Sequence, residues 1–255
     1  MHLLPLPALA DNYIWLLHDD NGQAIVVDPG QSAPVEHALI KHGWQLRAIL
    51  LTHHHDDHIG GVAGLLANHP VPVYAPDDAR IPSASVHVAD RGHVRLAAPQ
   101  VDFEVIAVPG HTRSHVAYYG AGVLFAGDTL FSLGCGRLFE GTPAQMLTSL
   151  DRLATLPGDT QLCCAHEYTV ANGRFAQTVE PGNTALAARL AEVRRLRDNH
   201  QPSLPVSLAS ELATNPFLRI DVPAVIDWCR RHHQPPADRT ARFACLRAAK
   251  DVFHA

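Results

Sequence analysis

The sequence predicts an α+β fold, with a larger domain of strands and helices over residues 1–168 and a small all-α domain over 169–255. Two observations predict this organisation. In the first part, short apolar strands and helical patterns follow one another, and several strands end in polar residues. From about residue 171 the strand signals disappear, and Ala/Leu/Arg-rich helical spacing takes their place, most clearly over 184–199. A chain of 255 residues is long enough for one large and one smaller domain.

Composition narrows the class of protein. Hydrophobic residues make up 47% and charged residues 18% of the chain, as in ordinary globular proteins. The net charge of −5 without a long Lys/Arg run argues against nucleic-acid binding. Five cysteines without a C-x-x-C pair indicate reduced thiols. No stretch has the roughly 20 apolar residues that span a bilayer. We therefore expect a cytoplasmic protein without a membrane partner, and a monomer.

The chain begins with a predicted hairpin and helix. Aromatic and branched residues over 13–18 and 23–27 predict two strands, joined by a turn at 19–22. Apolar residues recur at helical spacing over 34–42, and Gly43 suits the C-terminal cap of that helix.

The next segment predicts strands on either side of a helix. The continuous apolar run 46–51 is typical of a strand buried on both faces. A helix is predicted over 59–68 and a strand over 72–75, while 77–95 looks irregular. Alternation over 101–108 predicts a further strand.

The last part of the larger domain contains a second hairpin, a helix and a strand. Residues 116–119 and 123–126 flank a glycine-rich turn and predict paired strands. An amphipathic helix is predicted over 142–156, with Thr142 as N-cap and a proline at the first helical position. A final strand is predicted over 160–165.

Residues that can bind a metal follow directly after four of these strands. A rigid scaffold that aligns the strand ends would bring such residues to one rim. After 46–51 comes the H-x-H-x-D-H motif, and residues two apart in it point the same way. His53 and His55 could therefore serve one ion, and Asp57 and His58 a second, while His54 and Asp56 are not ligands. The candidates are His53, His55, Asp57, His58, His111, Asp128 and His166.

Each candidate also has a plainer interpretation. The histidine run could be a solvated loop or a tag-like accident, although a tag would lie at a terminus. His111 could cap a turn and Asp128 could N-cap the segment after it. His166 lies beside Cys163 and Cys164, which could form a Cys/His metal set or a thiol–imidazole pair, but cysteines at the end of an apolar strand usually serve packing.

The ligand types indicate hydrolysis assisted by two metal ions. Seven ligands are too many for one tetrahedral zinc and suit two ions that share a carboxylate. Imidazole and carboxylate accept zinc, iron or manganese. Two ions about 3.5–4 Å apart can hold a hydroxide nucleophile and stabilise an oxyanion at an attacked carbonyl.

Four motifs in this order resemble the metallo-β-lactamase superfamily: T-H-H-H-D-D-H-I-G-G, P-G-H-T, A-G-D-T-L-F and A-H-E-Y. Three further segments are similar to the hydroxyacylglutathione hydrolase (glyoxalase II) family: G-C-G-R-L-F-E-G at 134–141, N-P-F-L-R at 215–219 and R-A-A-K-D-V-F at 247–253. The resemblance covers nearly the whole chain.

The resemblance implies an αββα sandwich, catalytic over 1–168, and a helical substrate-binding domain over 169–255. It implies two divalent metal ions, for which zinc is favoured and iron or manganese are the alternatives. His53, His55 and His111 would bind the first metal, Asp57, His58 and His166 the second, and Asp128 would bridge them. No catalytic residue is expected apart from these ligands, among which Asp57 and Asp128 hold the nucleophilic hydroxide.

The implied reaction is hydrolysis of S-2-hydroxyacylglutathione, chiefly S-D-lactoylglutathione, to D-lactate and glutathione, the second step of methylglyoxal detoxification. The implied glutathione contacts are Arg137, Phe139, Tyr168, Arg247 and Lys250. Arg and Lys can pair with the carboxylates of the tripeptide, although Arg247 and Lys250 could instead lie on a solvated helix face. Arg137 and Phe139 stand where the family's animal members commonly have lysine and tyrosine, and Phe139 lacks the hydroxyl.

Other functions compete with this interpretation. A different hydrolase on the same scaffold, such as a lactamase, lactonase, phosphodiesterase or other thioesterase, is one alternative, and the acidic balance disfavours a nuclease. A persulfide dioxygenase shares much of the histidine motif but would depend on one redox-active iron, whereas the full second-metal set indicates hydrolysis. A metal-binding or interaction module without catalysis is the non-enzyme alternative.

Overall fold

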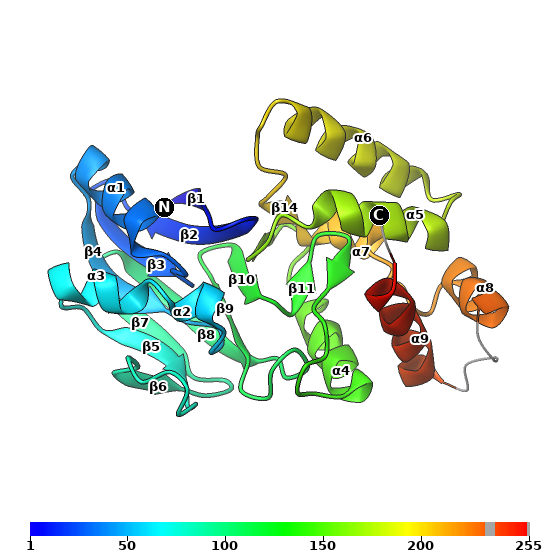
Figure 1. Ribbon diagram of the computed structural model, residues 1–255, viewed down its shortest axis with the longest axis horizontal. Helices are drawn as coiled ribbons and strands as arrows, with labels where there is room; N and C mark the ends of the chain where they lie inside the picture. Colours follow the sequence, from blue (N-terminus) through cyan, green and yellow to red (C-terminus); the bar gives the residue numbers. More distant parts are fainter. Residues whose placement is uncertain (233–237, 254–255) are drawn as a thin grey trace. The chain divides into compact units, whose positions relative to one another are not determined.

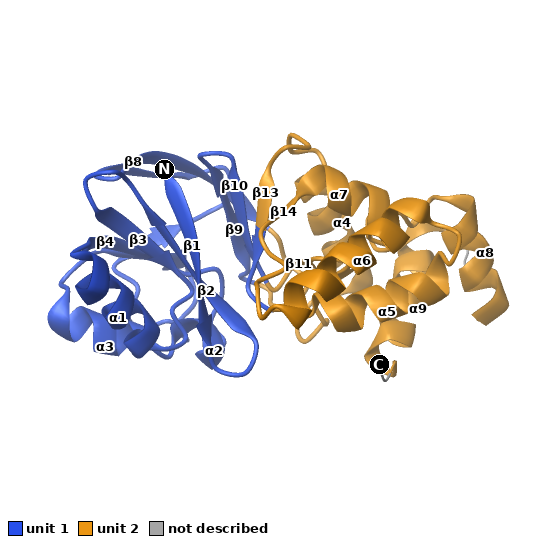
Figure 2. Cartoon of the chain, turned by 90° about the horizontal axis from the view of Figure 1, so that it is seen from above, with its two compact units in different colours: residues 1–107, 114–127, 163–166 blue, residues 108–113, 128–162, 167–255 orange. Residues whose placement is uncertain are grey.

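The computed structural model describes residues 1–232 and 238–253 (Figure 1). Its strands and helices confirm the predicted α+β class. The chain divides into two compact units (Figure 2): unit 1 comprises 1–107, 114–127 and 163–166, and unit 2 comprises 108–113, 128–162 and 167–255. The domain boundary expected at 168/169 stays a prediction, and the expected helical domain includes 233–237 and 254–255, which lie outside the described residues.

The first sheet of unit 1 is antiparallel at one edge and parallel at the other. Its strands, in sheet order, are β1 (His2–Ala8), β2 (Asn12–His18), β3 (Gln23–Val27), β4 (Gln45–Leu50), β5 (Val73–Pro76) and β6 (Val86–Val88). The strands predicted over 13–18, 23–27, 46–51 and 72–75 are confirmed. The edge strand β1 was not predicted because Pro5 and Pro7 interrupt it, and an edge strand tolerates proline since one side of it needs no ladder hydrogen bonds.

Helices cover one face of the first sheet. They are α1 (Ser32–His42), α2 (Asp56–Ile59) and α3 (Val62–Asn68). Apolar residues of α1 and α3 share one buried cluster with the strands of this sheet. The single helix predicted over 59–68 is wrong in its start, because the chain forms two helices. They are separated at Gly60-Gly61, where a Cβ on Gly61 would lie 2.3 Å from the carbonyl carbon of Gln31. Gly43 caps α1 with φ of 67°, as predicted.

The second sheet packs against the first. Its strands, in sheet order, are β14 (Val206–Ser207), β13 (Gln161–Cys164), β10 (Val123–Gly127), β9 (Val116–Gly120), β8 (Gln100–Ala107) and β7 (His93–Ala97). The hydroxyl of Tyr118 in β9 donates to the carbonyl of Leu51 at 2.9 Å, which ties the two sheets together. The expectation of an irregular 77–95 segment is wrong, since β6 and the start of β7 lie there.

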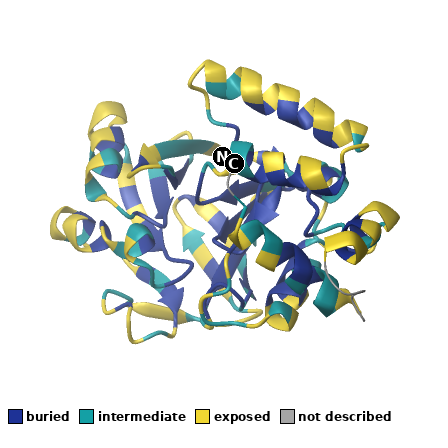
Figure 3. Ribbon diagram, turned by 45° about the vertical axis from the view of Figure 1, so that its right-hand side comes forward, coloured by how far each residue is buried: buried dark blue, intermediate teal, exposed yellow. Residues whose placement is uncertain are grey.

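Unit 2 is mainly helical. Its helices are α4 (Pro143–Leu153), α5 (Thr169–Val179), α6 (Thr184–Asp198), α7 (Leu208–Thr214), α8 (Pro223–His232) and α9 (Arg239–Asp251), and a short ribbon joins β11 (Leu130–Phe131) to β12 (Gly134–Cys135). Figure 3 shows helices with buried residues along one side and exposed residues along the other. The predicted N-cap of α4 is confirmed, because the Thr142 side chain accepts from the Gln145 N–H and a proline follows.

Candidate metal centre

Three of the predicted ligands meet in unit 1. Asp57 and His58 lie on α2, directly after β4 and its loop, and His166 follows β13. Asp57 Oδ2 lies 3.4 Å from His58 Nε2 and 3.3 Å from His166 Nε2. One ligand atom from each of the three residues lies within 4.8 Å of the others, a spacing that could hold a metal ion. This is the set expected for the second metal.

Hydrogen bonds orient both imidazoles of this set for metal binding. His58 Nδ1 lies 3.0 Å from Asp28 Oδ2, and His166 Nδ1 lies 2.7 Å from Asp11 Oδ1. A carboxylate only accepts hydrogen bonds, so each Nδ1 carries the proton. Each Nε2 is therefore left with a lone pair directed towards Asp57.

Asp57 is held as an anion. Burial raises its pKa, but its polar neighbours His166, His58 and Asn12 outweigh burial and keep the pKa of Asp57 well below the usual range. Asn12 Nδ2 donates to Asp57 Oδ2 at 3.0 Å. The carboxylate therefore faces two imidazole lone pairs, and a cation between the three groups would balance their negative potential.

His53 and His55 also converge in unit 1. Thr52 Oγ1 donates to Asp28 Oδ2 at 2.7 Å, so this oxygen accepts from His53 Nδ1 at 3.0 Å. The lone pair of His53 is thus on Nε2, which lies 3.0 Å from His55 Nδ1. These are the two ligands that the alternating motif assigned to one ion. His53 is fully buried, which contradicts a solvated histidine loop.

The remaining two predicted ligands meet in unit 2. His111 Nδ1 donates to the carbonyl of Arg137 at 2.9 Å, which leaves its Nε2 lone pair 3.4 Å from Asp128 Oδ2. Both side chains are buried. The alternative of Asp128 as a helix N-cap is wrong, because β11 follows it. Gly110 permits the turn before His111, since a Cβ there would lie 2.8 Å from Met146.

One cavity of unit 2 gathers these two ligands with every predicted glutathione contact. Its volume is about 470 Å³. His111 and Asp128 line it, together with Arg137, Phe139, Tyr168, Arg247 and Lys250. The contacts come from three regions of the chain: the segment after β12, the residue before α5, and α9. Ligand and substrate residues predicted separately therefore line the same cavity.

The positively charged side chains that line this cavity differ in their environments. The Arg247 guanidinium is buried, donates to the Cys135 carbonyl at 2.7 Å and pairs with Asp251 at 3.0 Å. The interpretation of Arg247 as part of a solvated helix face is therefore wrong. Burial lowers the pKa of Lys250, and the charges of Arg247 and Arg137 lower it further. An anionic ligand would relieve this crowding of positive charge.

Sequence reasoning missed the groups that orient the ligands. They are Asp11, Asn12, Asp28 and the carbonyl of Arg137. The position of Asp28 could have indicated its role, because Asp28 directly follows β3, just as the candidate ligands follow other strands. By its residue types Asp28-Pro29-Gly30 is typical of a turn. In the structure Asp28 has φ of 52°, and its buried carboxylate bonds Thr52 and His58.

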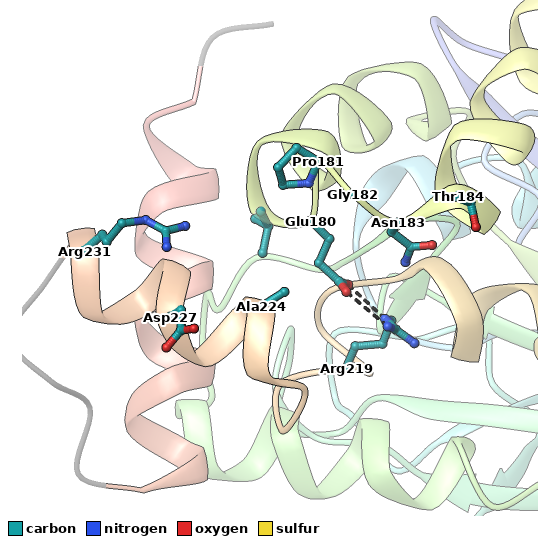
Figure 4. A pocket seen from close by; sticks show the side chains of 10 residues that line it. Glu180, Pro181, Gly182, Asn183, Thr184, Arg219, Ala224, Asp227 and Arg231 are labelled. Atoms are coloured by element: carbon teal, nitrogen blue, oxygen red, sulfur yellow. Dashed lines mark hydrogen bonds and ion pairs between the residues drawn. The ribbon is translucent and has the colours of Figure 1, made fainter.

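A second cavity of unit 2, of about 560 Å³, is lined by none of the predicted residues (Figure 4). Its most buried acid, Glu180, is paired with Arg219 through two hydrogen bonds of 2.8 and 3.0 Å. The ion pair is therefore satisfied within the protein, and this cavity is not the candidate active site.

Two family models divide the chain between them. The metallo-beta-lactamase superfamily matches residues 10–166, and the hydroxyacylglutathione hydrolase C-terminus matches residues 167–253. The chain belongs to the hydroxyacylglutathione hydrolase family of the metallo-beta-lactamase superfamily. The predicted family and its αββα fold are thereby confirmed.

Individual members of the family match along their whole length. The hydroxyacylglutathione hydrolase of Xanthomonas campestris pv. campestris (strain B100) is 54% identical over 257 residues, covering 100% of both chains. That of Cupriavidus taiwanensis is 52% identical and covers 98% of each. Among solved structures, TTHA1623 in a di-iron-bound form has a TM-score of 0.60 at 26% identity and covers 86% of this chain and 100% of its own.

Members of this family are hydrolases, so the enzyme class predicted from the sequence is confirmed and a non-catalytic module is not favoured. The residue-level assignments of ligands and substrate contacts stay predictions. Among the described helices, none is long and apolar enough to cross a membrane.

Proposed function

We propose that the protein hydrolyses S-2-hydroxyacylglutathione, chiefly S-D-lactoylglutathione, to D-lactate and glutathione, in the second step of methylglyoxal detoxification. The observation that carries the proposal is the cavity that is lined by buried His111 and Asp128 and also by Arg137 and Lys250. Such a cavity offers candidate metal ligands and cationic groups, which match a thioester carbonyl and the carboxylates of glutathione. Full-length relatives named hydroxyacylglutathione hydrolase support the same substrate.

We propose two divalent metal ions, zinc in the first place, with iron or manganese accepted by the same donors. The donor set supports this, since His53, His58, His111 and His166 each have Nδ1 bonded to a protein oxygen. In each of them Nε2 faces another of the predicted ligands. The first ion would take His53, His55 and His111, the second Asp57, His58 and His166, and Asp128 would bridge them. When bound, the ions would supply a hydroxide nucleophile near neutral pH and polarise the carbonyl.

The protein's own residues then position the substrate. Lys250 and Arg137 would pair with the carboxylates of the tripeptide, and the exposed rings of Phe139 and Tyr168 would pack on its backbone. Arg247 would add positive charge from its buried site. Asp57 and Asp128 would orient the hydroxide as anionic acceptors. The thiolate of glutathione is a good leaving group, so no separate general acid is required.

The direct test follows the loss of thioester absorbance with S-D-lactoylglutathione, with and without a chelator. We expect hydrolysis that the chelator abolishes and added Zn²⁺ restores. A D-lactoyl thioester of cysteamine, which lacks both glutathione carboxylates, serves as the matched substrate and should show a much higher KM. Equal KM for the two would contradict the glutathione contacts. No hydrolysis of either, or oxygen consumption with a glutathione persulfide, would favour another hydrolase or a dioxygenase.

We further propose a monomer in the cytoplasm. All five cysteines are buried and form no disulfide, which suits a reducing compartment. Light scattering of the purified protein would test the monomer, and fractionation of cells that produce it would test the compartment.

A further inference from the structure

The β11–β12 ribbon forms one wall of the candidate substrate cavity. Phe131 and Cys135 of the ribbon line this cavity. The backbone holds two further groups, because the carbonyl of Cys135 in β12 accepts from Arg247 and the carbonyl of Arg137, two residues later, accepts from His111 Nδ1. The position of this short ribbon therefore determines the orientation of a predicted metal ligand, His111, and of a predicted substrate contact, Arg247.

Two fully buried polar residues, Glu211 in α7 and Asn215 at its C-terminal cap, hold the ribbon. Glu211 accepts from the Ser132 hydroxyl at 2.8 Å and from the Leu133 N–H at 2.7 Å. Asn215 donates to the carbonyls of Phe131 and Gly134, at 3.1 and 3.0 Å. Asn215 also donates to Glu211 at 3.0 Å, so the two side chains act as one unit.

This arrangement has features that are unfavourable in themselves. Leu133 has φ of 59°, a conformation that side chains with a Cβ rarely adopt. Glu211 accepts a hydrogen bond from the backbone N–H of this strained residue. Glu211 is 0% exposed, and its hydrogen-bond partners are all neutral groups, so its charge is buried without an ion pair in the described residues. Strain and buried charge of this kind concentrate where a protein must hold one geometry for function.

We propose that Glu211 and Asn215 are positioning residues of the active site, which hold the β11–β12 ribbon so that the Arg137 carbonyl orients His111 and the Cys135 carbonyl anchors Arg247. This inference rests on the proposed function. Neither residue lines the substrate cavity. They act through the ribbon, and the N-P-F-L-R segment that starts at Asn215 thereby acquires a structural role.

The test compares three variants of the full-length protein. Glu211→Leu removes the acceptors, whereas Glu211→Gln can still accept from Leu133 and donate to Ser132. Thr214→Val removes a different, partly buried hydrogen bond of α7, from the Thr214 hydroxyl to the Ser210 carbonyl at 2.6 Å. We expect Glu211→Leu to raise KM for the thioester, weaken calorimetric binding of glutathione and speed metal loss to a chelator, each about tenfold. Glu211→Gln and Thr214→Val should stay within about twofold of the wild type.

Glu211→Leu with wild-type KM, glutathione binding and metal retention would overturn the proposal, and so would Thr214→Val with the same losses. If Glu211→Leu does not fold, Ser132→Ala removes only the hydroxyl bond to Glu211 and should shift the same three quantities about two- to threefold; no shift would again overturn it. Glutathione binding and metal retention do not depend on turnover. A wild-type protein without thioesterase activity would therefore refute the proposed function while these two comparisons still decide the role of Glu211.

Discussion

Replacing Asp28 by Asn should prevent His58 from binding a metal, although the side chain at position 28 keeps its hydrogen bonds. Asp28 Oδ1 accepts from the Thr52 N–H at 2.8 Å, and Oδ2 accepts from the Thr52 hydroxyl and from His58 Nδ1. In Asp28→Asn, Oδ1 can still accept from Thr52. The new amide then donates to His58 Nδ1, which moves the imidazole proton to Nε2, the nitrogen that faces Asp57.

The expected loss of metal affinity follows from the free energy needed to move the imidazole proton back to Nδ1. To restore the Nε2 lone pair, His58 must take the proton back onto Nδ1 and lose its hydrogen bond from the new amide, which costs about 1 kcal/mol. The amide N–H and the Nδ1–H then face each other as two buried donors, which costs about 1–3 kcal/mol more. The sum of about 2–4 kcal/mol corresponds to metal binding that is about 30- to 700-fold weaker. The Thr52 hydroxyl, which would then accept from the new amide, can turn its proton towards His53 Nδ1, so His53 is disturbed in the same way.

The assay is metal content after competition with a chelator, measured beside thioester turnover and the thermal unfolding midpoint. Asp28→Asn should lose metal and turnover while its midpoint stays near that of the metal-free wild type. Asp11→Asn is the matched control, because Asp11 bonds His166 in the same way but is 41% exposed, so water can replace the lost acceptor and the effect should be smaller. Wild-type metal retention in Asp28→Asn would refute the tautomer argument.

Three further predictions concern the same centre and its cavity. Asp128→Ala should lose turnover and metal content together in paired metal analysis and thioester assays, since one carboxylate is proposed to serve both ions; thioesterase activity in a metal-free Asp128→Ala protein would refute the mechanism. Lys250→Met should raise KM about tenfold, because a charged hydrogen bond to substrate is lost. Burial lowers the pKa of Lys250, so the wild-type ammonium should lose its proton below the ordinary lysine value of about 10.4, and KM should rise with pH in that window; a pH–KM profile that is the same in Lys250→Met would contradict the assignment. Phe139→Tyr should lower KM about two- to tenfold by restoring one hydroxyl hydrogen bond, measured by initial rates, and a raised KM would show that the ring lies elsewhere.

Local patterns predicted most of the secondary structure. The strand over 23–27 could be found from its branched apolar residues. The strand over 101–108 could be found because apolar alternation reports directly which side chains a sheet buries. β1 escaped prediction because its two prolines are tolerated only at the edge of a sheet, and the edge position depends on which other strands pair with it. β6, β7 and β14 are short or partly exposed, so their sequences carry little apolar signal.

The sequence by itself determined the residue types of the candidate ligands, their order and their place at the ends of strands. These properties are local, since a motif such as H-x-H-x-D-H and the apolar run before it are read from neighbouring residues. The resemblance to the family likewise predicted substrate contacts, and all five of these residues line one cavity.

Only the tertiary structure decided how the ligands are oriented. The tautomers of His58 and His166 depend on Asp28 and Asp11, which are 30 and 155 residues away along the chain. The anchoring of Arg247 depends on the Cys135 carbonyl, 112 residues away. A buried donor must find an acceptor wherever the fold supplies one, and because that partner is set by packing and not by sequence distance, no local pattern records it.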